Sequence, residues 1–171
     1  MRELDSNPIR ILRVANHKSL QEMATLSGVN LQTLYLNECG VFPNVLPKIR
    51  DFLSRKYSVD EGELETSYRE FILEKRKAFS ETYEGKVDTL PEANLTIPPI
   101  GMYRTFIDPK FSRMGFAKTL CIEPAGLYRL EVFPLPTIPG RIREALLQVG
   151  MSKDTLEELE ERTNEFHART I

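Results

Sequence analysis

The stretch SLQEMATLSGVNLQTLYLNECG, residues 19–40, has the spacing of two short helices joined by a tight turn. Ser19 and Glu22 form a capping box, in which the serine hydroxyl accepts the amide hydrogen of Glu22 and the Glu22 carboxylate accepts that of Ser19. Gly28 stands where the chain must turn sharply, and we expect it to have a positive φ. Asn30 is a good N-cap for the second helix. The stretch therefore predicts a helix-turn-helix element.

Three further helices are predicted around this element. Apolar residues recur at helical spacing over residues 9–15, 45–56 and 61–85. Ser6 or Asn7 is the expected cap of the first of these helices, and Asn44 that of the second. The N-terminal part is therefore expected to be a five-helix bundle.

The pattern changes in the C-terminal half. Residues 86–99, KVDTLPEANLTIPP, carry three prolines and no periodicity, which is typical of a linker or a draped loop. The segments AKTLCIE (117–123) and LYRLEVF (127–133) flank Pro124-Ala-Gly126, which predicts a β-hairpin. Two helices are expected after it, over residues 141–150 and from Ser152 onward. No internal repeat is apparent.

The predicted fold is therefore mainly α, with a small α+β C-terminal domain. A helix-turn-helix bundle with a long last helix is expected over residues 1–85, a linker over 86–99 and the C-terminal domain over 100–171. The core of that domain is expected to contain an aromatic cluster of Tyr103, Phe106, Phe111 and Phe116.

Length and composition limit the class of protein. A chain of 171 residues can bury one good core or two small ones of roughly 80 residues each. No apolar run approaches the roughly 18 residues that span a bilayer, and the N-terminus MRELDSNPIR is not a signal peptide. We therefore expect a cytoplasmic protein with no membrane partner. Cys39 and Cys121 lie outside any CxxC pattern, so reduced thiols are expected and a structural zinc site is not.

Charge is unevenly distributed along the chain, whose formal net charge is −2. Residues 1–60 hold eight Lys/Arg against six Asp/Glu, and residues 61–92 hold five against nine. Residues 93–171 hold ten of each. Only the N-terminal part is mildly basic, which suits a DNA ligand without requiring one.

Several residues at fixed offsets point to a known family. Met23-Ala24 is a small apolar pair in the second helix, Gly28-Val29-Asn30 is a glycine-apolar-cap turn, and Leu34 is an inward apolar position of the third helix. Residues 9–56 thereby resemble the helix-turn-helix domain of the Cro and lambda-repressor type. Arg13 and Glu38 lie where that family often has residues that pair across helices, and Glu38, Gly40 and Pro43 match its E-x-G-x-x-P run.

The sequence departs from the family pattern at two positions. Leu20 stands where the family commonly has a glutamine that supports base or phosphate contacts. Asn37 stands where the third helix usually buries an apolar residue. In addition, residues 31–37 contain no lysine or arginine, so guanine contacts through arginine are not expected from this helix.

The resemblance implies a sequence-specific DNA-binding transcriptional regulator of the phage-repressor type. We expect Gln32 to pair with an adenine edge and Thr33 or Leu36 to contact a thymine methyl. Phosphates are expected to bind at the capped helix N-termini and at polar side chains near them. The predicted DNA-binding residues are Ser19, Gln21, Asn30, Leu31, Gln32, Thr33, Tyr35, Leu36, Asn44 and Lys48.

Two alternatives remain at this point. Leu31, Tyr35 and Leu36 can instead form an apolar patch that docks on another protein, such as polymerase or a phage regulator. The stripe of Leu156, Leu159, Thr163 and Phe166 in the last helix either packs onto its own domain or forms a homodimer. The single histidines have no neighbouring triad or metal partners in the sequence, so neither an enzyme nor a cofactor is expected.

Overall fold

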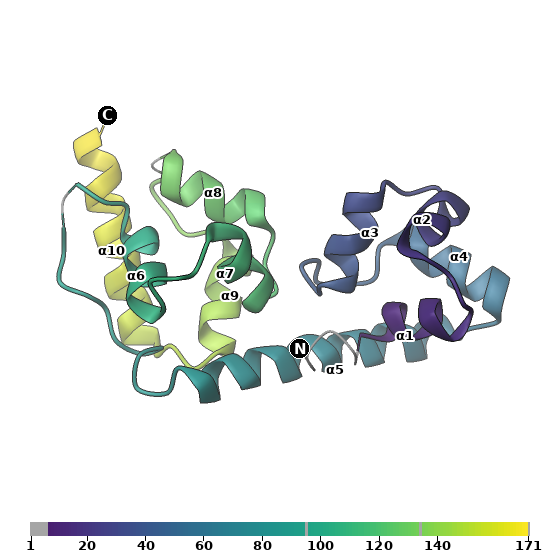
Figure 1. Ribbon diagram of the computed structural model, residues 1–171. Coiled ribbons are helices and arrows are strands. Elements are labelled where there is room, and N and C mark those ends of the chain that lie inside the picture. Colours follow the sequence, from purple (N-terminus) through teal and green to yellow (C-terminus); the bar gives the residue numbers. More distant parts are fainter. Residues whose placement is uncertain (1–6, 95, 134, 171) are drawn as a thin grey trace. The chain divides into compact units, whose positions relative to one another are not determined.

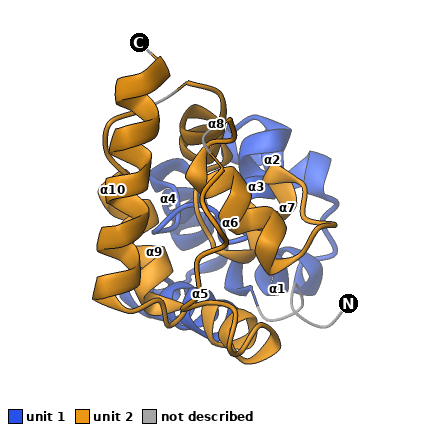
Figure 2. Cartoon of the chain, turned by 90° about the vertical axis from the view of Figure 1, so that its left-hand side faces the viewer, with its two compact units in different colours: residues 1–75 blue, residues 76–171 orange. Residues whose placement is uncertain are grey.

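The computed structural model describes residues 7–94, 96–133 and 135–170, and within these ranges every regular element is a helix (Figure 1). The chain divides into two compact units, Met1–Lys75 and Arg76–Ile171 (Figure 2). The division falls inside helix α5. The helices are α1 (Pro8–Ala15), α2 (Leu20–Ser27), α3 (Leu31–Glu38), α4 (Pro47–Tyr57), α5 (Glu61–Thr82), α6 (Pro99–Ile107), α7 (Arg113–Thr119), α8 (Pro124–Val132), α9 (Gly140–Gln148) and α10 (Lys153–Thr170).

The first unit is built on one small apolar core. Helix α3 packs against α1 and α2, and α2 also packs against α4. Each of these helices has fully buried inward-facing apolar residues, one each on α1, α2 and α3 and two on α4, and α5 closes the core with Tyr68. Burying such side chains stabilises the unit by roughly 1.5–3 kcal/mol each. The fully buried members are Ile9, Met23, Leu34, Ile49, Leu53 and Tyr68.

The caps around α2 follow the sequence prediction. The Ser19 hydroxyl accepts the amide hydrogen of Glu22 at 3.2 Å, and the Glu22 carboxylate accepts that of Ser19 at 2.8 Å. Gly28 has φ +67°, and the next amide, that of Val29, donates to the Ala24 carbonyl at 3.1 Å. This turn aims the chain into α3, where the Asn30 side chain accepts from the amide of Thr33 at 3.1 Å.

Replacing Gly28 with alanine should lower the free energy of unfolding by about 1–2 kcal/mol. No atom lies within 4 Å of the position that a Cβ would occupy, so the cost comes from the left-handed backbone rather than from crowding. Urea unfolding followed by circular dichroism measures the loss. Gly140→Ala is the matched control, because the added Cβ there also meets no atom and the residue lies in an ordinary helical conformation. An equal loss in both variants would contradict this explanation.

The expected cap of α4 is wrong. The N-cap is Leu46 and not Asn44, and the helix begins at Pro47. A residue before proline is driven to extended backbone, whereas proline itself is well suited to the first helical position. Leu46 accordingly has φ −63° and ψ 136°, so the helix cannot start before Pro47.

The predicted β-hairpin of the C-terminal part is also wrong, and with it the α+β fold class. Residues 117–123 and 127–133 contribute to α7 and α8, and the described residues contain no strand. Pro124 is the first residue of α8 instead of part of a hairpin turn. The buried residues Leu127, Leu130 and Glu131 are spaced by three and four, which is helical periodicity.

The second unit has its own core. Tyr103 and Phe116 are fully buried at its centre, and Phe111 packs against them at the edge. The Tyr103 hydroxyl donates to the carbonyl of Val87 at 2.8 Å, so the proline-containing segment after α5 is bonded into this unit. Phe106 lies outside the buried cluster, beneath the ammonium of Lys86 at 5.8 Å.

The last helix packs within this second unit. Helix α10 contacts α6 and α9, and Leu156, Leu159 and Thr163 are buried there. Phe166 remains half-buried. Packing onto its own domain therefore accounts for three of the four stripe residues. No helix in the part of the chain that the structure describes is long and apolar enough to cross a membrane.

Candidate nucleic-acid interface

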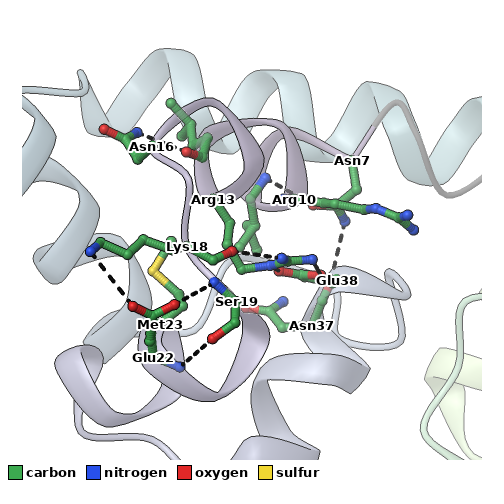
Figure 3. A network of polar contacts seen from close by, with 12 residues as sticks. Asn7, Arg10, Arg13, Asn16, Lys18, Ser19, Glu22, Met23, Asn37 and Glu38 are labelled. Carbon is green, nitrogen blue, oxygen red and sulfur yellow. Dashed lines mark hydrogen bonds and ion pairs between the residues drawn. The ribbon is translucent and has the colours of Figure 1, made fainter.

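An ion pair joins the ends of α1 and α3 (Figure 3). The Arg13 guanidinium donates to both carboxylate oxygens of Glu38, at 2.6 and 3.0 Å, and to the carbonyl of Lys18 at 3.0 Å. The side chains are only 14% and 5% exposed, and the hydrogen bond to Glu38 raises the pKa of Arg13. One side chain thus fixes α3 against α1 and also holds the residue that precedes α2.

Asn37 occupies the position at which the sequence departs from the family pattern. It is fully buried, yet its side chain donates to the Tyr68 hydroxyl at 2.7 Å and accepts from the amide of Leu46 at 3.1 Å. Its carbonyl accepts from the Asn7 side chain at 3.3 Å (Figure 3). Because these polar groups are satisfied, α3 remains helical through Glu38 despite the buried amide.

The outward face of α3 is narrower than predicted. Leu31 and Gln32 in its first turn are exposed, whereas Thr33, Tyr35 and Leu36 are half-buried. The exposed surface of α3 is therefore concentrated at the N-terminal turn of the helix. In helix-turn-helix proteins that bind DNA, the N-terminal residues of this helix contact the base edges.

The predicted phosphate-binding residues lie at the surface of the first unit. Ser19, Gln21, Asn30, Asn44 and Lys48 are all exposed. The Asn44 side chain also accepts from Arg69 at 3.3 Å. They belong to the caps and first turns of α2, α3 and α4, except for Asn44, which lies in the loop before α4.

The start of α2 already holds a carboxylate. Hydrogen bonds from the Ser19 backbone and side chain lower the pKa of the exposed Glu22. The capping box uses the amides of Ser19 and Glu22, which leaves those of Leu20 and Gln21 as the donors available to an anion there. A phosphate at this helix must therefore approach beside Glu22 and not replace it.

Two basic residues were missed in the sequence. A shallow concavity beside the turn is lined by Leu26, Ser27, Gly28, Lys48, Asp51, Phe52, Arg55 and Lys56. Arg55 and Lys56 are exposed, and Arg55 lies two helical turns after Lys48 on α4. That spacing of seven was available in the sequence as a signal of a shared helix face.

Charge within the first unit is divided between its helices. Residues 8–57, which include α1 to α4, hold seven Lys/Arg against three Asp/Glu. Helix α5 holds four against six. The basic excess thus belongs to the helices that carry the exposed turn of α3 and its surrounding polar groups.

Comparison with known proteins gives no relative: no family model, no curated protein and no solved structure matches the chain. The chemistry of the site therefore rests on its own residues. These residues are the exposed Gln32 on α3, the polar caps of α2 and α3, and the basic side chains of Lys48, Arg55 and Lys56 on α4.

Proposed function

We propose that the chain is a sequence-specific DNA-binding transcriptional regulator of the phage-repressor type, acting in the cytoplasm without a cofactor. The observation that carries this proposal is the exposed N-terminal turn of α3. Its first residues face outward, while the turn at Gly28 and the Arg13–Glu38 pair hold the helix in place. Such a regulator acts by covering a promoter or by recruitment at an operator.

Base reading falls mainly to Gln32. An exposed glutamine at this place can pair bidentately with N6 and N7 of adenine in the major groove. Leu31, 42% exposed, supplies apolar contact area for a thymine methyl. The half-buried Thr33, Tyr35 and Leu36 shape the surface beside these two residues.

Phosphate contacts fall to the groups around α3. Lys48, Arg55 and Lys56 supply positive charge along one side of α4, and Gln21 and Asn30 supply polar groups at the starts of α2 and α3. Contacts of this kind set the register on the duplex and carry no sequence information of their own.

Replacing Gln32 with alanine should reduce discrimination at one base pair by roughly 1–3 kcal/mol, because the bidentate amide contact is lost. The target is first obtained by selection from randomised duplexes, and fluorescence anisotropy then compares the selected site with single-base variants. Gln21→Ala removes the same amide from the exposed start of α2, and it should weaken binding to all duplexes about equally. A uniform loss with Gln32→Ala would remove Gln32 from base reading.

Docking on another protein is the second candidate function. It is favoured by Leu26 and Leu31, which are 49% and 42% exposed on either side of the turn. Tyr35 and Leu36 add less to such a patch than the sequence predicts, because both are half-buried. A salt series separates the two functions, since DNA binding loses affinity with a slope of about −0.9 per phosphate contact. No binding to any duplex at low salt would favour the protein partner.

A further inference from the structure

The second unit repeats the architecture of the first. Helices α7, α8 and α9 match α2, α3 and α4 when 93 is added to each residue number from 18 to 53. The packing is also repeated, because α8 contacts α6 and α7 as α3 contacts α1 and α2. The identical pairs are Ser19/Ser112, Ala24/Ala117, Leu34/Leu127, Tyr35/Tyr128, Glu38/Glu131, Pro43/Pro136, Ile49/Ile142, Arg50/Arg143 and Leu53/Leu146.

The turn between the paired helices is the same in both units. Cys121 has φ +53° and stands at the position of Gly28, whose φ is +67°. The amide of Ile122 donates to the Ala117 carbonyl at 2.9 Å, as that of Val29 does to Ala24. Ser112 caps α7 by accepting from the amide of Gly115 at 3.0 Å, which matches the role of Ser19. The second unit therefore contains its own helix-turn-helix.

The bracing ion pair is repeated atom for atom. Arg104 on α6 donates from Nε and Nη2 to the two oxygens of Glu131 on α8, at 2.8 and 2.9 Å. Its third contact is the carbonyl of Phe111, the residue before the Ser112 cap, just as Arg13 contacts Lys18 before Ser19. An apolar core alone does not require this polar arrangement in two places, so the match extends beyond helix packing.

The charge division is repeated as well. Residues 99–148, which include α6 to α9, hold seven Lys/Arg against four Asp/Glu, whereas α10 holds three against six. Arg141 is exposed at the second position of α9, where Lys48 stands on α4. The surroundings of α8 thus repeat one basic position of the flank beside α3, whereas Gln148 and Val149 stand at the positions of Arg55 and Lys56.

The exposed residues of α8 differ from those of α3. Ala125 replaces Gln32, so the adenine contact is lost, and Arg129 stands at the position of Leu36. Arg129 is exposed, and its side chain makes no ion pair within the described ranges. The Tyr128 ring beside it lies under the Arg113 guanidinium at 5.5 Å. Arginine is the side chain that most often reads guanine, through O6 and N7.

We propose that the second unit is a second DNA-reading domain, so that one chain contacts two different half-sites without a partner copy. This inference rests on the proposed function of the first unit. Each half-site is a short block of fixed base sequence. The block read by α3 contains the adenine contacted by Gln32, and the block read by α8 contains a guanine contacted by Arg129. The target is therefore asymmetric and not a palindrome.

Selection from randomised duplexes with the full chain tests the proposal. The expected product has two separate blocks of fixed sequence, and sedimentation should show one 19.7-kDa chain per duplex. Arg129→Ala should reduce the preference for guanine in one block roughly 5- to 150-fold and leave the adenine of the other block unchanged. Arg141→Ala should weaken binding to all duplex sequences equally and reduce the magnitude of the salt slope by about 1.

Arg169→Ala is the matched control, since it removes the same charge from the exposed end of α10 and should change neither block. Selection of a single block of fixed sequence, together with no effect of Arg129→Ala on base preference, would overturn this inference and leave the proposed function standing. Binding of two chains to one palindromic duplex would also overturn this inference and leave the proposed function standing. Absence of binding to any duplex would overturn both.

Discussion

Replacing Glu131 with alanine should lower the free energy of unfolding of the second unit by about 3–5 kcal/mol. The Glu131 side chain is 4% exposed and accepts hydrogen bonds from Arg104 and from Arg113, the latter at 2.7 Å. Its removal leaves the Arg104 guanidinium, 14% exposed, without its counter-charge in a poorly solvated site. Urea unfolding followed by circular dichroism measures the loss.

Glu123→Ala is the control for this prediction, because Glu123 is exposed and makes no side-chain cap bond to α8. Its loss should stay below about 1 kcal/mol. Glu38→Ala should cost the first unit a similar amount to Glu131→Ala, since the Arg13–Glu38 pair has the same bonds. If the Glu131→Ala variant unfolds at the same urea concentration as the parent protein, the ion pair has no stabilising role.

Replacing Asn37 with leucine should destabilise the first unit by about 2–4 kcal/mol. The substitution leaves the amide of Leu46 without its acceptor and removes the bond that the Tyr68 hydroxyl accepts from the Asn37 side chain, while that hydroxyl still donates to the carbonyls of residue 37 and Phe42. Buried polar groups that lose their partners keep the full cost of leaving water. The shift of the urea midpoint at constant slope is the measurement.

A second substitution tests the cause of this loss. Tyr68→Phe should cost less stability in the Asn37→Leu background than in the parent protein, because the bond from the Asn37 side chain to the Tyr68 hydroxyl is already absent there, and a double-mutant cycle isolates the energy of that bond. Additive losses in the double variant would mean that the two side chains act independently and that overpacking at position 37 is the cause.

Local signals predicted most of the first unit. The capping box at Ser19, the positive φ of Gly28 and the Asn30 cap each depend on residues within a few positions, and all three are present. The error at Asn44 came from ranking a good capping side chain above the restriction that Pro47 places on the residue before it. Backbone sterics decided the start of α4.

The second unit was mispredicted because its signals are weaker at each of these points. Cys121 makes the turn that Gly28 makes in the first unit, so no glycine marks it. Pro124-Ala-Gly126 has the composition of a hairpin turn, whereas in the structure Pro124 is the first residue of α8, which packs against α6 and α7. The repeat is concealed because most positions differ, and five of the nine identical pairs are buried in both units.

The candidate site was predictable in its location more than in its exposed surface. The face of α3 follows from helical periodicity, so Gln32 and Leu31 could be named from the sequence. The half-burial of Tyr35 and Leu36 depends on tertiary packing around α3, which no local rule supplies. Arg55 follows Lys48 by seven residues, so periodicity places both on one face of α4, but that this face borders Gly28 depends on the packing of α4 against α2.

The separation of charge inside each unit has a consequence for kinetics. A body whose first four helices are basic and whose fifth is acidic has an electric dipole, although the whole chain carries a formal net charge of only −2. The field of a polyanion orients such a body through its dipole, although the small net charge gives little overall attraction. Each unit, taken alone, would thus be turned toward a duplex before collision, and weak overall attraction would let it leave an incorrect sequence quickly. Under the proposed function, the same charges favour a correctly oriented first encounter and shorten the time spent on incorrect sequences.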